Sequence, residues 1–74
     1  MADHILNCRN LNCPMPIVKI AKAFRTMEED ETLEVTATDP AFKADVEAWI
    51  RKTGHELVSF TDEDEKVALI KKTS

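Results

Sequence analysis

The segment Cys13-Pro14-Met15-Pro16 holds the residues best suited to chemistry in this sequence. Apolar residues at helical spacing follow it, so Cys13 is predicted to lie at or beside the N-cap of a helix. A helix start presents unpaired N–H groups and a partial positive charge, and both favour a thiolate over a thiol. The pKa of Cys13 is therefore expected to lie below the ordinary value of about 8.5.

The two prolines bear on the same turn. Pro14 and Pro16 would remove the N–H groups at the first and third helical positions, which leaves the amide of Met15 within reach of a capping side chain. Pro14 also favours extended backbone at Cys13 and would project the sulfur outward. The alternative is a small buried cysteine. The position of Cys13 between Asn12 and Pro14 favours an exposed, reactive thiol instead.

Cys8 is the other of the two cysteines in this sequence. Its spacing from Cys13 matches neither a C-x-x-C redox pair nor a paired zinc motif. His4 and His55 would add ligands only if the fold brought them together, so neither a metal site nor a cofactor is predicted. Cys8 is interpreted as a small residue at the end of a strand, with a resolving thiol as the alternative.

The composition limits the class of protein. A chain of 74 residues is expected to form one domain over 1–74, with its chemistry on the surface, because such a small domain buries only about 60% of its unfolded surface. A net charge of −4 argues against nucleic-acid binding driven by phosphates. Lys19, Lys22 and Arg25 share one helical stripe, which is either a solvated face or a basic patch. No targeting or membrane-spanning segment is evident, so a cytoplasmic protein with reduced thiols is expected.

The first half of the chain is predicted as strand, helix and strand. His4–Cys8 has the length of a short strand, and the period changes to a helical one over Pro14–Met27. The acidic run Glu28–Glu31 opposes the helix macrodipole, so this helix end is expected to stay solvated. Thr32–Ala37 alternates as a half-buried strand.

A second helix is predicted to begin at Pro40. Asp39 can cap it, and Pro40 suits a first helical position because its missing N–H would have no partner there. Gly54, the only glycine, is predicted to end the helix in a left-handed conformation. Trp49 lies on the apolar stripe and is interpreted as a core residue.

Two further strands, Leu57–Thr61 and Lys66–Lys72, are separated by four acidic residues and predict an antiparallel hairpin. The unbroken apolar run Val67–Ile70 favours a central position for the last strand. The fold class is therefore α/β (α+β), a two-layer βαβαββ sandwich. Its mixed four-stranded sheet carries both helices on one face.

These residues resemble a known family. The chain is similar to the TusA/SirA-type sulfur carrier proteins in a motif and its downstream context, Leu6-x-x-Arg9-x-Leu11-x-Cys13-Pro14-x-Pro16, then Asp39-Pro40, then Gly54-His55-Glu56-Leu57. The resemblance implies strand order 1-2-4-3 and a persulfide carried on Cys13. This sequence departs from the family's usual pattern at two places: Asn10 and Glu29-Asp30 stand where the family tends to have glycine. Asparagine tolerates the left-handed conformation.

The resemblance also implies partners. The donor would be a cysteine desulfurase or a rhodanese-like protein, and the acceptor a DsrE-like protein or a thiolation enzyme. The pathway would be tRNA thiolation, sulfur oxidation or cofactor sulfuration. A monomeric covalent carrier, more than a stand-alone turnover enzyme, is implied, with no direct contact to nucleic acid or membrane. Arg9 would hold the anionic sulfur or form a surface salt bridge. The candidates for partner docking are Lys19, Lys22, Arg25 and Asp39.

Two other functions remain open. The first is a thiol redox switch, in which an oxidant attacks Cys13 and Cys8 resolves it as a disulfide. The second is a non-catalytic interaction or RNA-binding module on the open face of the sheet. The acidic balance and the lack of exposed strand aromatics speak against RNA.

Overall fold

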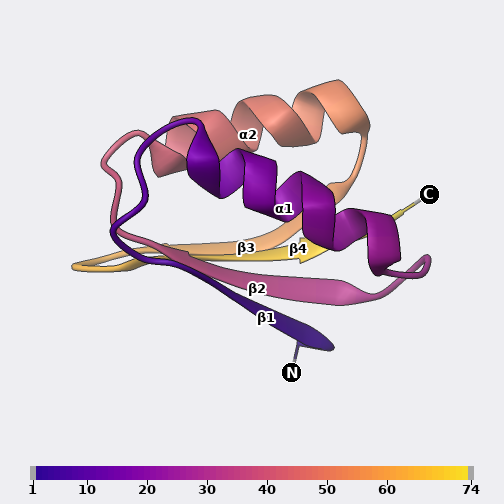
Figure 1. The fold of residues 1–74 in the computed structure, drawn as a ribbon. Coiled ribbons are helices and arrows are strands. Elements are labelled where there is room, and N and C mark those ends of the chain that lie inside the picture. The colour runs from indigo at the N-terminus through magenta and orange to yellow at the C-terminus, as the bar shows by residue number, and fades with distance from the viewer. Residues whose placement is uncertain (1, 74) are drawn as a thin grey trace.

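The computed structural model describes residues 2–73 and shows a four-stranded mixed sheet with two helices on one of its faces (Figure 1). The elements are β1 (His4–Cys8), α1 (Met15–Thr26), β2 (Thr32–Ala37), α2 (Phe42–Thr53), β3 (Glu56–Asp62) and β4 (Lys66–Lys71). This confirms the predicted βαβαββ order and the two-layer architecture. Within residues 2–73, neither helix has the length and apolar character needed to cross a bilayer.

The strand order is β1-β2-β4-β3. β1 pairs with β2 in parallel, and β4 pairs antiparallel with both β2 and β3. The central position predicted for the last strand from its continuous apolar run is therefore confirmed. The parallel pairing of β1 and β2 brings the carboxyl ends of these strands together, with Cys8 opposite Ala37. The loops that lead into α1 and α2 consequently start side by side at one edge of the sheet.

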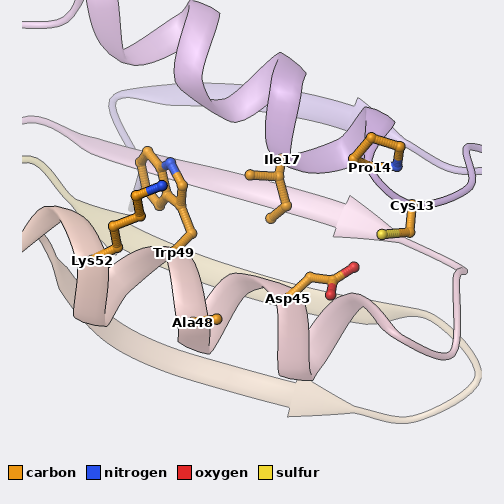
Figure 2. Close-up of a pocket in the computed structure, with 7 residues that line it drawn as sticks. All are labelled: Cys13, Pro14, Ile17, Asp45, Ala48, Trp49 and Lys52. Carbon is orange, nitrogen blue, oxygen red and sulfur yellow. The ribbon is translucent and has the colours of Figure 1, made fainter.

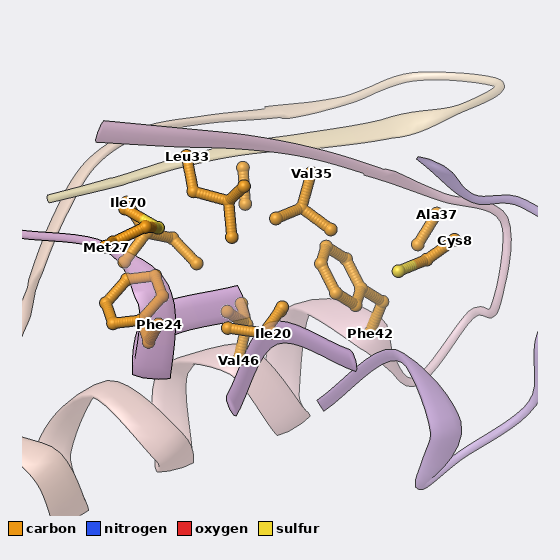
Figure 3. Packing of buried hydrophobic residues seen from close by; sticks show 11 residues of the cluster. Cys8, Ile20, Phe24, Met27, Leu33, Val35, Ala37, Phe42, Val46 and Ile70 are labelled. Carbon is orange, nitrogen blue, oxygen red and sulfur yellow. The ribbon is translucent and has the colours of Figure 1, made fainter. Parts of the chain in front are cut away.

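The core lies between the sheet and the two helices (Figure 3). Alternate residues of β2, namely Leu33, Val35 and Ala37, face it, as expected for a strand with one covered face. Phe42 contributes the largest fully buried side chain, from the first turn of α2. Cys8 is the last residue of β1, which confirms its interpretation as a small residue at the end of a strand, and its side chain is fully buried.

Both ends of α1 make contacts that the sequence did not indicate. Pro14 occupies the N-cap position and no side chain caps the helix, so Cys13 lies beside the cap, which is one of the two predicted positions, and its side chain does not act as the cap. The far end is not left to solvent either. The Lys72 ammonium donates to the carbonyl oxygens of Phe24 and Met27, at 2.6 and 2.7 Å. The Lys72 cation thus adds a donor to two carbonyl oxygens at the C-terminal end of α1, where positive charge is favoured.

Three of the residues that the structure describes adopt left-handed backbone. Gly54 ends α2 with φ 83°, as predicted, and Asn10 keeps the turn after β1 with φ 65°. Asp30 has φ 73° in the loop after α1, where the resembled family tends to have glycine. α2 begins at Phe42, later than the predicted Pro40, because the chain after Asp39 first forms a turn with the Phe42 amide bonded to the Asp39 carbonyl.

Candidate functional site

Cys13 lies exposed in the turn between β1 and α1, and Asp39 holds that turn in place. The Cys13 amide donates to Oδ2 of Asp39 at 2.9 Å, while Oδ1 of the same carboxylate accepts the Ala41 amide at 3.2 Å. A neighbouring bond from the Asn10 amide to the Thr38 hydroxyl, 2.9 Å, joins the same two loops. Asp39 therefore does not cap α2 as predicted. It fixes the loop before α1 to the loop before α2.

The backbone around Cys13 explains why its side chain does not cap the helix. The Met15 amide, the donor expected to face the sulfur, is taken by the Asn12 carbonyl at 2.8 Å. The Pro14 carbonyl accepts the Val18 amide, 3.1 Å, so Pro14 is the N-cap and the first helical residue is Met15, two positions after Cys13. Pro16 is buried against the core, whereas Met15 is exposed beside the turn.

An open groove of about 270 Å³ runs from Cys13 between the two helices (Figure 2). One end holds Cys13 with its sulfur directed towards the Asp45 carboxylate, and Lys52 lies towards the other end. Ile17 from α1 and Trp49 from α2 border the space between these ends. The full lining is Cys13, Pro14, Ile17, Asp45, Ala48, Trp49 and Lys52.

The charges at this groove raise the pKa of Cys13. The largest cause is a hydrogen bond from the thiol to the Asp45 carboxylate, followed by partial desolvation and by the negative charges of Asp45 and Asp39. The prediction of a lowered pKa is therefore wrong for the resting protein, because two carboxylates, and not a helix start, surround the sulfur. The Asp45 carboxylate is therefore the charged group that the Cys13 thiol faces.

Cys8 has a different environment. Burial raises the pKa of its thiol, and the charge of Lys19 opposes that effect. Both cysteines are free thiols, one buried and one exposed. Among residues 2–73, no three His, Cys, Asp or Glu side chains are grouped as they would be to hold a metal ion.

Arg9 forms a two-pronged ion pair with Glu65 in the β3–β4 turn. Its Nε and Nη2 atoms donate to the two carboxylate oxygens at 2.7 and 3.0 Å, and Nη1 donates to Oδ1 of Asn7 at 3.2 Å. The bond to Arg9 holds the pKa of Glu65 below its usual value. The structure thus contains the surface salt bridge that was one of the two interpretations of Arg9. A role in holding anionic sulfur stays a prediction.

The basic residues expected to dock partners are exposed on α1. Lys19, Lys22 and Arg25 do not line the groove, so their role also stays a prediction. The cation that does line it, Lys52, was not singled out from the sequence, and neither was Asp45. A signal existed, since positions 45, 48, 49 and 52 follow the i, i+3, i+4, i+7 pattern of residues that share one face of a helix.

Comparisons with known proteins agree with this structure. Residues 4–72 match the family described as Sulfurtransferase TusA. The chain belongs to this family. The sulfur carrier protein TusA of Allochromatium vinosum is 36% identical over 72 residues, which cover 97% of this chain and 95% of that protein.

Other members of the TusA family differ in length. YrkI of Bacillus subtilis, named provisionally as a sulfur carrier protein, is 45% identical over 62 residues, or 84% of this chain and 83% of the relative. A relative in Aquifex aeolicus with the same provisional description is 40% identical over 73 residues, which is 97% of this chain and only 37% of the relative. This TusA-type unit therefore matches nearly a whole protein in one relative and one part of a longer protein in another.

Proposed function

We propose that this TusA-family protein carries sulfane sulfur as a persulfide on Cys13 and passes it to a second protein. The observation that supports this most is the placement of the Cys13 thiol, exposed at the end of an open groove and beside the Asp45 carboxylate. A sulfur that two partner proteins must reach in turn has to lie on the surface. A space of about 270 Å³ is also smaller than most small-ligand pockets.

The transfer chemistry uses both residues. Asp45 accepts the thiol proton as the Cys13 sulfur attacks the outer sulfur of the donor persulfide. The new bond forms between the Cys13 sulfur and that outer sulfur, the donor's S–S bond breaks, and the donor thiolate leaves and takes the proton from Asp45. Each exchange converts one thiol and one persulfide into another such pair, so no external oxidant or reductant is needed.

Negative charge from Asp45 and Asp39 also favours release. The carboxylates that raise the pKa of the thiol disfavour an anionic persulfide at the same position. The persulfide form is therefore less stable, relative to the free thiol, than it would be at a cationic site. This suits a carrier that passes its sulfur on.

The partners proposed for this carrier are those that the resemblance to the family implies. The donor is a cysteine desulfurase or a rhodanese-like protein, and the acceptor is a DsrE-like protein or a thiolation enzyme, in tRNA thiolation, sulfur oxidation or cofactor sulfuration. The carrier works in the cytoplasm as a monomer between these encounters, where its thiol stays reduced. Lys19, Lys22 and Arg25 contribute to steering partners, so association slows as salt rises.

The redox-switch alternative has less support. Such a switch needs a disulfide between Cys8 and Cys13, but Cys8 is fully buried in the core. The buried thiol would have to leave the core before it could resolve an oxidised Cys13.

Intact-mass spectrometry tests the carrier proposal. After incubation with a cysteine desulfurase and cysteine, the protein should gain one sulfur atom, and a reductant should remove it. Cys13→Ser should gain none, while Cys8→Ala should load like the wild type. Loading of the Cys13→Ser variant, or no loading of the wild type by desulfurase and rhodanese donors alike, would contradict the proposal.

A further inference from the structure

The groove beside Cys13 has opposite charges at its two ends. Asp45 lies next to the sulfur, with Asp39 nearby, and Lys52 lies at the far end (Figure 2). Lys52 takes part in none of the ion pairs found within residues 2–73. Between these ends the walls are apolar, formed by Ile17, Ala48 and Trp49. Along the groove, starting at the Cys13 sulfur, the lining therefore changes from negative to apolar to positive.

We propose that this groove binds the cysteine-bearing segment of each sulfur-relay partner in an extended conformation. The segment places an apolar side chain two positions from its cysteine against Ile17 and Trp49, and an acidic side chain four positions away against Lys52. This rests on the proposed carrier function and adds the sequence chemistry by which Cys13 selects partners. Donor and acceptor must both reach the same sulfur, so both use the same groove.

The spacing follows from chain geometry. Asp45 and Lys52 are seven residues apart on α2, which corresponds to about 10 Å along the helix. An extended segment advances about 3.3 Å per residue and directs every second side chain to the same side. Positions two and four from the partner cysteine therefore face the groove at about 7 and 13 Å, and the flexible Lys52 side chain covers the remaining difference.

Charge complementarity fixes the acidic residue at the far end. A carboxylate next to the partner cysteine would meet Asp45 and Asp39 and be repelled, whereas one four positions away meets the Lys52 ammonium. Exposed ion pairs of this kind contribute little in absolute terms, and a rate preference of about two- to fivefold is expected at low ionic strength. The groove thus tunes the encounter and binds the segment only weakly, so a non-covalent peptide occupies it only at high concentration.

A reactive peptide measures this preference directly. The probe is the blocked peptide Cys-Ala-Leu-Ala-Glu as its 2-thiopyridyl mixed disulfide, together with a version that ends in Lys and both peptides in reverse order. Cys13 attacks the peptide sulfur, the bond to the thiopyridyl sulfur breaks, and 2-thiopyridone leaves with the thiol proton. The release rate, measured well below saturation and corrected with Cys13→Ser, reports docking at Cys13.

Charge reversal at one lysine provides the matched comparison. With the wild type, the Glu peptide should react about two- to fivefold faster than the Lys peptide in one of the two chain directions. Lys52→Glu should reverse that order. Lys43→Glu, an equally exposed change on the same helix but outside the groove, should leave it unchanged. Thermal unfolding of all three proteins confirms that each is folded.

Trp49 gives a second readout without covalent chemistry, because it is the only tryptophan in the chain. The unreactive peptide Ser-Ala-Leu-Ala-Glu should shift the emission of Trp49 in Cys13→Ser, and replacing its Leu by Ser should abolish the shift. Equal rates for the Glu and Lys peptides in both directions, or an equal effect of Lys52→Glu and Lys43→Glu, would overturn the proposal. Sulfur loading of Cys13 is measured separately, so failure of the groove proposal is distinguished from failure of the carrier function.

Discussion

Substitution of Cys8 tests whether the two cysteines have different roles, one in the buried core and one at the exposed site. The Cys8 side chain is fully buried beside Ala37, so Cys8→Ala removes one buried sulfur and leaves a small void. The lost burial is comparable to that of one or two methylene groups, or about 1 kcal/mol of unfolding free energy. Cys8→Ser keeps the size but places a hydroxyl in the apolar core, which costs about 1–3 kcal/mol if the hydroxyl lacks a partner.

These costs should be visible in thermal unfolding. For a domain of this size, 1 kcal/mol corresponds to a change in melting temperature of about 4–8 °C. Cys8→Ala should therefore melt about 4–8 °C below the wild type, and Cys8→Ser lower still. Cys13→Ser, changed at an exposed position, should melt close to the wild type. Circular dichroism gives the melting curves, and intact-mass spectrometry at a temperature where all variants are folded gives sulfur loading.

The stability order and the loading order should be opposite. Both Cys8 variants should lose stability and keep loading, while Cys13→Ser should keep stability and lose loading. Loss of loading in a folded Cys8→Ala variant would place Cys8 in the mechanism. A melting temperature for Cys8→Ser equal to that of the wild type would contradict the buried environment assigned to this residue.

Three further outcomes follow from individual contacts. Asp45→Asn removes the main cause of the raised pKa of Cys13, so the midpoint of its alkylation rate against pH should move to lower pH; an unchanged profile would remove Asp45 from the site. Arg9→Gln should slow sulfur transfer if the guanidinium holds the sulfur, and Glu65→Gln should not. Equal effects of the two substitutions on the transfer rate would mean that Arg9 acts only through its ion pair with Glu65, 2.7 Å at its closest. Burial and the charge of Lys72 lower the pKa of His55, so the folded state favours the neutral ring. The contribution of His55 to the free energy of unfolding should be full above the unfolded pKa of about 6.5 and should decline below it. His55→Phe should remove that part of the decline, as measured by urea titrations across pH.

The features that could be predicted from the sequence are those set by local patterns. Three local patterns each predicted one part of the fold: the alternation in Thr32–Ala37, the continuous apolar run Val67–Ile70 and the lone Gly54. Each signal arises from residues within a few positions of one another, where periodicity and turn chemistry act directly.

The features that could not be predicted depend on contacts between distant segments. The pKa of Cys13 is set by Asp45 on the second helix, and the backbone at Cys13 is held by Asp39, 26 residues away. Lys72 reaches back to the last turn of the first helix. A local view of the Cys13 turn includes the helix start and omits these charges, so it gave the wrong direction for the pKa.

Locating the transferred sulfur tests the central claim most directly. The protein is loaded by a cysteine desulfurase supplied with radiolabelled cysteine, separated from the donor, alkylated without reductant and digested, and the label is assigned to a peptide. The proposed carrier places one labelled sulfur on the peptide that contains Cys13, and a thiol added before alkylation releases it. Label on the Cys8 peptide, or an unlabelled protein linked by a Cys8–Cys13 disulfide, would contradict it.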